Sequence, residues 1–319
     1  HGAGDVKRLS PVDVSGQYLK HIRSAWDQQF PDQPLADQDI VLTLPASFDE
    51  VARELTIEAA SVAGLARVVL IEEPQAAFYA WVYKHDSDWD SRVEIGQKIL
   101  VCDIGGGTTD FTLIRVRKSA GEKKANDEKT NPQKIQFHRV AVGNHLILGG
   151  DNLDLAIAKF LEQKLTGDGK LEAYQWDVLI GISRNIKEQM LTDEGADSIT
   201  VSLPSRGSKL IGGSMQTEVA RDEIRDLIVD GFLPKVALTE KPQRHASGFQ
   251  EFGLPYASDA GITRYLSDFL TTHADAGETI VPDTDVAAEK SSEESNENSN
   301  AKPDVVLFNG GFFASPILR

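Results

Sequence analysis

Cysteine is almost absent from this chain of 319 residues, in which Cys102 is the only one. A single cysteine excludes an intrachain disulfide framework and fits a reducing cytoplasm. Basic residues are also few, since 33 Lys and Arg stand against 49 Asp and Glu, which gives a net charge of −16. Nucleic acids and anionic membranes are bound through basic patches, so this charge argues against either as the main partner.

Several familiar signals are missing as well. No apolar run approaches the roughly 20 residues that span a bilayer, and no apolar stretch follows Lys7 and Arg8 as it would in a signal peptide. The histidines lack HxxxH or HExxH spacing, which argues against a zinc site. The GxSxG, GxxxxGK[ST] and GxGxxG motifs are also absent. We therefore expect a soluble, acidic, cytoplasmic protein that is not an α/β-hydrolase, a P-loop protein or a Rossmann protein.

The first part of the chain alternates between β-rich runs and segments with helical spacing of apolar residues. This order is typical of an α/β layer. Ser47 is a candidate N-cap for the first helix, with Glu50 three residues later as its capping-box partner. The predicted elements are strands Ile40–Leu44 and Val68–Ile71 and helices Asp49–Ala63 and Pro74–Tyr83.

The rest of the chain opens with β-rich runs that leave no room for helices between them, which predicts an antiparallel meander. These runs are Ile99–Ile104, Phe111–Val116 and Ile135–Val142. The further predicted elements are helices Leu153–Leu165, Val178–Leu191 and Arg221–Leu238 and strands Ile199–Leu203 and Asp304–Phe308.

Two polar segments interrupt this pattern. Residues Lys118–Gln133 are predicted to form an extended hairpin loop. Residues His273–Pro303 hold eight acidic residues and two lysines, a net charge of −6. The acidic segment has almost no large apolar residue to offset the entropy of ordering, so we expect disorder. A tail that binds a basic partner is the alternative.

The most informative segment is Asp103–Asp110, DIGGGTTD, which lies between two predicted strands. Consecutive glycines let the backbone approach a bound group closely, and successive N–H groups form a concavity that binds anions. A threonine hydroxyl adds a donor, and Asp103 could hold Mg²⁺ directly or through water. A plain glycine-rich hairpin turn is the alternative, but the flanking acid, threonine and strands favour phosphate binding.

Two glycine pairs and one pair of acids add to this signal. Gly149–Gly150 precede a predicted helix, and Gly310–Gly311 follow the last predicted strand. Each pair alone fits a tight turn, whereas three glycine-rich turns in one chain indicate a nucleotide cleft. Glu72 and Glu73 are typical of a solvated loop. In a cleft, Glu73 could orient an attacking water molecule or hold Mg²⁺ indirectly, and a helix N-terminus favours its charge.

Taken together, these segments resemble the ATPase domain of the heat-shock protein 70 (DnaK-like chaperone) family. ILVCDIGGGTTDFTLIRV resembles the family's second phosphate-binding segment, and VVLIEEPQAAFYAW resembles its Glu-Pro helix start. LTLPASFDEVARELTIEAASVAGL resembles its strand-then-helix segment, LGGDNLDLAIAKFL its Gly-Gly helix start, and VVLFNGGFFASP its adenosine segment. The resemblance spans most of residues 40–316 and is poorest near 238–303.

The resemblance implies an α/β, actin-like ATPase (ribonuclease-H-like) fold with an incomplete first lobe and most of the second. Its implied parts follow one another along the chain. They are 1–97, the C-terminal part of lobe I; 98–163, the lobe II core with the phosphate-binding hairpin; 164–240, a helical/β subdomain of lobe II; 241–272, a divergent helical insertion; 273–303, an acidic disordered loop; and 304–319, the return to the lobe II core with the adenosine-site turn.

The resemblance also implies roles for individual residues. The implied catalytic residues are Glu73, Asp103 and Thr108. The implied nucleotide-binding residues are Gly105, Gly106, Gly107, Thr108, Gly149, Gly150, Lys187, Gly310 and Gly311. Asp103 would lie near Mg²⁺ and the attacking water, and Asp110 near a bound K⁺. The implied cofactors are ATP or ADP with Mg²⁺, and such an inventory suits phosphoryl transfer, which needs mainly positioning and charge stabilisation.

The chain departs from the family pattern at three places. Ala314 stands where an arginine usually stacks on adenine, and Arg184 stands where a glutamate usually contacts the ribose or base, so adenine recognition is expected to differ. The family's first phosphate loop and its catalytic lysine have no counterpart here. We therefore expect a fragment of a longer protein that has little or no ATPase activity by itself.

The leading hypothesis is the ATP-binding region of a DnaK-like molecular chaperone of the cytoplasm and the stress response. In the full-length parent, nucleotide-driven lobe closure would be coupled to the binding of unfolded peptide, with co-chaperones as further partners. One alternative is a small-molecule (sugar) kinase of the same superfamily. Another is a non-catalytic nucleotide-sensing module, which Ala314 and Arg184 would favour.

Overall fold

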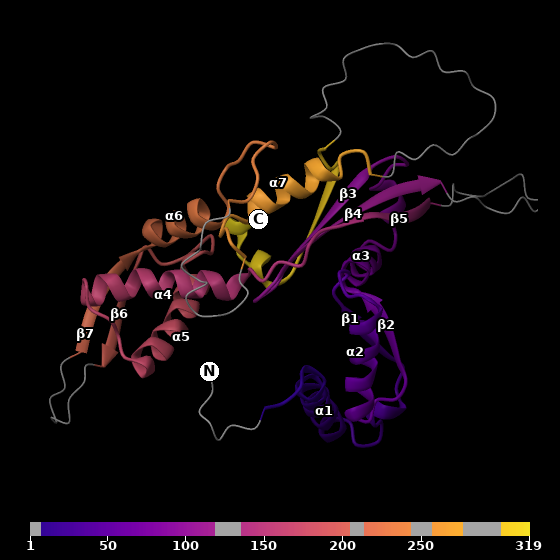
Figure 1. Cartoon of the computed structure of the whole chain (residues 1–319), viewed down its shortest axis with the longest axis horizontal. Coiled ribbons are helices and arrows are strands. Elements are labelled where there is room, and N and C mark those ends of the chain that lie inside the picture. Colours follow the sequence, from indigo (N-terminus) through magenta and orange to yellow (C-terminus); the bar gives the residue numbers. More distant parts are fainter. Residues whose placement is uncertain (1–7, 119–134, 205–213, 244–256, 277–300) are drawn as a thin grey trace, which may run out of the picture. The chain divides into compact units, whose positions relative to one another are not determined.

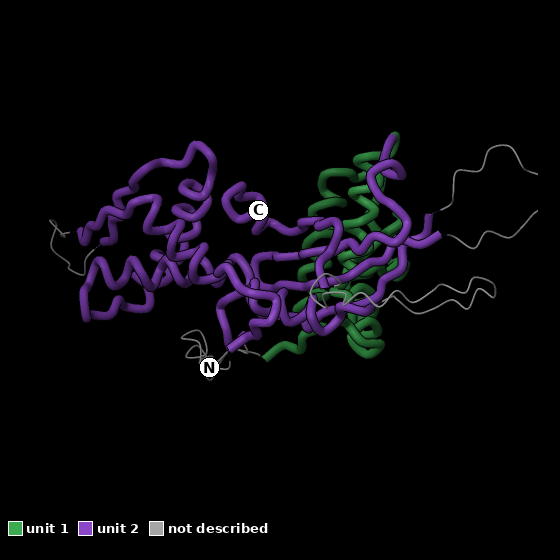
Figure 2. The backbone as a smooth tube through the Cα atoms, turned by 90° about the horizontal axis from the view of Figure 1, so that it is seen from above, with its two compact units in different colours: residues 1–87 green, residues 88–319 purple. Residues whose placement is uncertain are grey.

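The computed structural model describes residues 8–118, 135–204, 214–243, 257–276 and 301–319. The loop predicted at Lys118–Gln133 and most of the acidic segment therefore lie outside the described residues. The chain divides into two compact units, residues 1–87 (unit 1) and 88–319 (unit 2) (Figure 2). The division falls ten residues before the predicted end of lobe I at residue 97, and the finer subdivision of the chain stays a prediction.

Unit 1 is built on a pair of parallel strands, β1 (Ile40–Leu44) and β2 (Val68–Glu72), in register from Ile40↔Val68 to Leu44↔Glu72. Helix α2 (Glu50–Val62) connects the strands, and α3 (Glu73–Lys84) follows β2 without a loop (Figure 1). The predicted strand–helix–strand–helix order is thus confirmed. Parallel strands need a crossover connection, so the helical pattern at Asp49–Ala63 between two β-rich runs indicates two parallel strands joined by a helix.

The capping prediction for α2 is wrong. The helix begins after Asp49, whose Oδ1 accepts a hydrogen bond from the Ala52 N–H at 2.8 Å, so Ser47 lies outside the helix. Aspartate caps a helix as well as serine does, and it stands nearer to the first apolar position of the pattern.

Helix α1 (Pro11–Gln29) was not predicted, although the sequence signals its start. Ser10 Oγ accepts from the Asp13 N–H at 3.1 Å and Asp13 Oδ2 accepts from the Ser10 N–H at 3.2 Å, which forms a capping box ahead of Pro11. The helix packs on α2, where a Cβ added to Gly16 would lie 3.1 Å from the Val62 side chain.

Unit 2 centres on a four-stranded sheet in the order β5-β4-β3-β8. Strands β3 (Lys98–Ile104), β4 (Thr109–Lys118) and β5 (Ile135–Val142) pair antiparallel, which confirms the predicted meander. Strand β8 (Val305–Asn309) returns from the C-terminal end of the chain and pairs parallel to β3 (Figure 1). The carboxyl ends of β3 and β8 therefore meet at one edge, where Asp103 is the register partner of Asn309.

Helices and a β-hairpin complete unit 2. In helix α4 (Gly150–Thr166), which includes the helix predicted at Leu153–Leu165, the side chains of Leu153, Ile157 and Leu161 are fully buried. Helix α6 (Arg221–Phe232) stops well before the predicted end at Leu238, because Pro234 disfavours helical backbone at the residue before it. The elements are helices α4 (Gly150–Thr166), α5 (Ala173–Met190), α6 (Arg221–Phe232) and α7 (Ile262–Thr272), the hairpin of β6 (Ser198–Pro204) and β7 (Ser214–Ala220), and the 3₁₀ turns Gly311–Ala314 and Pro316–Leu318.

Hairpin strand β7 and helix α7 were not among the predicted elements, although α7 falls in the stretch expected to be a helical insertion. A membrane span would need a longer and more apolar helix than any that the described ranges contain.

Candidate functional site

Two of the glycine-rich segments are joined by backbone hydrogen bonds. The Gly150 N–H donates to the Gly105 carbonyl at 3.0 Å, and the Asp151 N–H donates to the Gly106 carbonyl. A Cβ added to Gly149 would lie 2.7 Å from the Gly106 oxygen and 2.8 Å from the Gly105 oxygen, closer than real Cβ atoms come. We call Gly105, Gly106, Gly149 and Gly150 the glycine junction. Glycine is required at 149 because the two segments touch through their backbones.

Thr109 fixes the turn of β3 and β4 to the segment that leads into α4. Its side-chain hydroxyl is fully buried and donates to the Leu148 carbonyl at 2.7 Å. Its backbone also exchanges two hydrogen bonds with Leu146, at 3.0 and 3.1 Å. The predicted phosphate-binding turn is thus held from one side by the sheet and from the other by the start of α4.

The third glycine-rich turn lies beside the same sheet edge. Gly310 directly follows β8 and has φ +93°, a left-handed backbone that favours glycine. A Cβ there would meet the Ile104 carbonyl oxygen at 2.1 Å. In the adjacent pair, Asn309 Nδ2 donates to Asp103 Oδ2 at 2.9 Å. The turn after β8 is therefore packed against the end of β3, where the GGGTTD turn begins.

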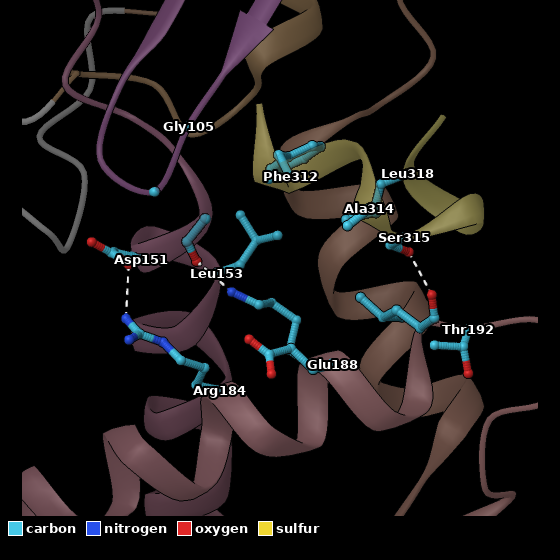
Figure 3. Close-up of a pocket in the computed structure, with 15 residues that line it drawn as sticks. Gly105, Asp151, Leu153, Arg184, Glu188, Thr192, Phe312, Ala314, Ser315 and Leu318 are labelled. Carbon is cyan, nitrogen blue, oxygen red and sulfur yellow. Dashed lines mark hydrogen bonds and ion pairs between the residues drawn. The ribbon is translucent and has the colours of Figure 1, made fainter. Parts of the chain in front are cut away.

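A cavity of about 470 Å³ opens beside these turns (Figure 3). Its wall combines glycine backbone, charged side chains of α5 and an apolar surface. The glycines are Gly105, Gly106, Gly150 and Gly311, the charged residues are Asp151, Arg184, Lys187 and Glu188, the apolar residues are Leu153, Leu191, Phe312, Ala314 and Leu318, and Thr192 and Ser315 complete the wall. The cavity thus gathers five of the predicted nucleotide-binding residues together with Arg184 and Ala314.

A buried acid, Asp154, links α4 to the charged wall of the cavity. Its side chain is 1% exposed, and its two carboxylate oxygens face different cations. Oδ1 lies 2.6 Å from Lys187 Nζ, and Oδ2 accepts from Arg184 Nε at 2.9 Å. Arg184 also contacts Asp151 Oδ1 at 2.9 Å (Figure 3). The hydrogen bond that Arg184 donates to Asp154, and then the charges of Asp154 and Asp151, raise the pKa of the Arg184 guanidinium.

Sequence analysis missed Asp154, although a signal was present. The residue occupies the same helical stripe as Ile157, Ala158 and Leu161, at spacings of three, four and seven residues. A charged residue on an otherwise apolar stripe is buried with its neighbours, and a buried charge needs a partner.

The remaining predicted site residues do not line the cavity. Among them, Asp110 is buried, and both of its carboxylate oxygens lie 3.0 Å from His145 Nδ1. Burial raises the pKa of Asp110, and His145 only partly offsets this. Gly107, Thr108 and Gly149 belong to the same turns, and Asp103 is the last residue but one of β3. Glu73 belongs to unit 1, in the half-buried first turn of α3.

This arrangement is typical of phosphate-binding domains, since a glycine-rich turn between two strands meets the N-terminal end of a helix beside a lysine. A family model for the Hsp70 protein matches residues 2–239. The chain therefore belongs to the Hsp70 family, whose members have an actin-like ATPase fold and bind nucleotide. The resemblance to DnaK-like chaperones and the prediction of their ATP-binding region are confirmed.

Curated relatives agree with this assignment. The chain is 30% identical over 190 residues to a chaperone protein HscA homolog of Acinetobacter baumannii, covering 60% of this chain and 27% of the relative. It is 31% identical over 221 residues to the HscA homolog of Pseudoalteromonas atlantica, covering 69% and 31%. For the HscA homolog of Histophilus somni it is 30% over 223 residues, covering 69% and 29%. The chain spans less than a third of the length of these relatives, and none of them favours the sugar-kinase alternative.

Proposed function

We propose that the cavity in unit 2 binds ATP and ADP together with Mg²⁺. The observation that carries this proposal is the chemical composition of the cavity wall, which combines glycine backbone and Lys187 with an apolar surface. A nucleotide needs both kinds of surface, because its phosphates bind N–H donors and positive charge and its base binds an apolar surface. The volume of about 470 Å³ lies within the range usual for small-molecule sites.

The turn itself supports phosphate binding by specific N–H groups. The Gly105 N–H donates to the Thr108 carbonyl at 2.9 Å, so Gly105 closes the turn and is not a phosphate donor. Within the described parts of the chain, the N–H groups of Gly106, Gly107 and Thr108 donate to no backbone acceptor. These three successive donors are therefore the ones that we assign to the β- and γ-phosphates.

Asp103 is assigned to the metal side of the site. Its Oδ2 accepts from Asn309, which orients the carboxylate at the end of β3. Mg²⁺, when bound, neutralises charge on the phosphate oxygens. We leave K⁺ outside the proposal because the Asp110 carboxylate already accepts from His145 through both oxygens. The assignment of K⁺ to Asp110 stays a prediction, and nucleotide titrations in K⁺ and in Na⁺ test it.

Catalysis is assigned to Glu73, Asp103 and Thr108 on the family resemblance. Glu73 would orient the attacking water, with Asp103 near that water and Thr108 near the γ-phosphate. In a full-length protein, Glu73→Ala should slow ATP hydrolysis in single-turnover assays and leave the Kd for ATP within about twofold. A collapse of ATP binding would show that the assigned role is wrong.

At the level of the whole protein, we propose that unit 1 belongs to the first lobe of the ATPase fold and unit 2 to the second. Lobe closure on nucleotide would control the binding of unfolded peptide, with co-chaperones as further partners. The names of the relatives, all chaperone proteins, support this proposal. A cytoplasmic location and a role in the stress response complete it, and the free thiol of Cys102 is compatible with a reducing compartment.

The proposal is tested by calorimetric titration of ATP and ADP into the chain, with and without Mg²⁺. The informative variant is Gly106→Ala, because the atoms nearest to an added Cβ there belong to the Asp151 side chain, at 3.5 Å or more, and the residue lies on the cavity wall. The fold should tolerate the methyl group, whereas a phosphate should not. We expect Mg²⁺-dependent binding that Gly106→Ala weakens at least tenfold.

Gly181→Ala is the matched control, since a Cβ at this position of α5 meets nothing within 4 Å and the residue is not on the cavity wall. It should leave the Kd unchanged. Failure of the wild-type chain to bind either nucleotide, or equal binding by both variants, would contradict the proposed function.

A further inference from the structure

We propose that Asp154 is a positioning residue of the nucleotide site, which holds Lys187 and Arg184 in place at the cavity wall. The inference rests on the proposed function, because it concerns the same cavity. Neither the sequence motifs nor the family resemblance pointed to Asp154. Its carboxylate is buried, and its two oxygens contact both cations.

Asp154 is an unusual residue for its place in the fold. It lies on the buried stripe of α4 between Leu153 and Ile157, with a side chain that is 1% exposed. A buried carboxylate is costly unless its oxygens are paired, and here each oxygen faces a separate cation of α5. A hydrophobic residue would pack these two helices without that cost, so the acid has a further consequence for α5.

The contacts of Lys187 show what that consequence is. An ammonium group carries three N–H donors and no acceptor. Nζ forms an ion pair with Asp154 Oδ1 at 2.6 Å, and one N–H donates to the Gly150 carbonyl at 3.0 Å. Because the side chain is 17% exposed and lines the cavity, the ammonium is also open to an anionic group inside it. Asp154 thereby holds the ammonium against the glycine junction, beside the proposed phosphate donors.

Arg184 is held by the same carboxylate. Its Nε donates to Asp154 Oδ2, and Nη2 contacts Asp151 Oδ1, both at 2.9 Å. The guanidinium has five N–H donors, of which these contacts use two, and Arg184 lines the cavity. One buried acid therefore orients the charged groups of both Lys187 and Arg184, whose long side chains would otherwise be flexible. This lowers the entropic cost of binding an anion.

The simplest alternative is that Asp154 only staples α4 to α5. The two readings differ in what Asp154→Asn does to nucleotide affinity compared with stability. The asparagine keeps the volume and one acceptor but removes the charge that orients both cations. If Asp154 is a positioning residue, Asp154→Asn should weaken the Kd for ATP about tenfold, the usual worth of a charge-assisted hydrogen bond.

Asp259→Asn is the matched control, because Asp259 is another buried aspartate of unit 2 that pairs with an arginine, Arg264, at 2.9 Å. It does not line the cavity. It should lower the Tm as Asp154→Asn does and leave the Kd for ATP within about twofold. A staple without a positioning role predicts that both variants lose Tm and keep their affinity, and this result would overturn the inference.

A double-mutant cycle with Lys187→Met tests whether Asp154 acts through the lysine. In the Lys187→Met background, Asp154→Asn should change the Kd for ATP by less than about threefold. If the fold-changes in Kd of the two single variants multiply in the double variant, the inference is overturned. The double variant also removes the uncompensated ammonium, so the comparison remains available if Asp154→Asn alone unfolds. Absence of binding by the wild-type chain would instead reject the proposed function itself, and the inference with it.

Discussion

The glycine junction makes a prediction that contrasts two adjacent residues. Gly149→Ala would place a Cβ 2.7 Å from the Gly106 oxygen and 2.8 Å from the Gly105 oxygen, and neither backbone atom can move alone. Gly150→Ala would place its Cβ 3.6 Å from the Gly105 oxygen, an ordinary contact. The same chemical change is thus expected to disrupt the junction at one position and to be tolerated at the next.

The expected magnitudes follow from the cost of overpacking. Inserting a methyl group into a packed site usually costs about 1–3 kcal/mol. In a unit of this size, each kcal/mol lowers the Tm by about 2–4 °C, so Gly149→Ala should lower it by about 2–12 °C. Gly150→Ala should stay within about 1 kcal/mol of the wild type, because alanine is favoured over glycine in the first turn of α4. Backbone strain plays no part, since Gly149 has an extended φ of −167°.

Urea unfolding of the two variants, followed by circular dichroism, measures this difference in the free energy of unfolding. Both variants should also be titrated with ATP, because a displaced junction moves the N–H donors of the turn. Gly149→Ala should weaken ATP binding more than its neighbour does. Equal stability of the two variants would show that the two glycine segments are not held together in the way described, and would refute the reasoning.

Three further predictions concern other parts of unit 2. Burial raises the pKa of Cys102 to about 12, so a thiol reagent at pH 8 should label it only as fast as the chain unfolds; labelling at the rate of a free thiol would be inconsistent with its burial. Burial by itself would raise the pKa of Asp259, but two backbone N–H donors and Arg264 outweigh it and hold the pKa below 3.8. The stabilising contribution of the Asp259 carboxylate is therefore present above pH 3.8 and is lost as the pH falls through the lowered folded-state pKa. In urea titrations, Asp259→Asn should lower the free energy of unfolding by about 1–3 kcal/mol at pH 7 and by less at pH 3. An equal loss of stability at both pH values would contradict this. Because Ala314 offers only a methyl group among apolar neighbours, ATP and GTP should bind with Kd values within about tenfold of each other, and a strong preference for ATP in competition titrations would show an unrecognised contact to adenine.

Local sequence patterns were sufficient to predict most of the secondary structure. The meander of β3, β4 and β5 and the strand–helix order of unit 1 could be predicted because apolar periodicity and turn residues are properties of short segments. Helix α1 has an equally local signal in its capping box. Pro234 is a local signal for the end of α6, since a proline disfavours helical backbone at the residue before it.

The sequence by itself determined the family, the glycine-rich turns and the candidate phosphate donors, since each is a short run of residues whose chemistry does not depend on distant partners. The tertiary structure decided the rest. It placed Gly149 against Gly106 and set β8 beside β3 across some 200 residues of chain. It also showed Asp154 between Lys187 and Arg184. Such contacts join residues that are far apart in the sequence, and burial, which gives a charge its partners, is a property of the folded chain alone.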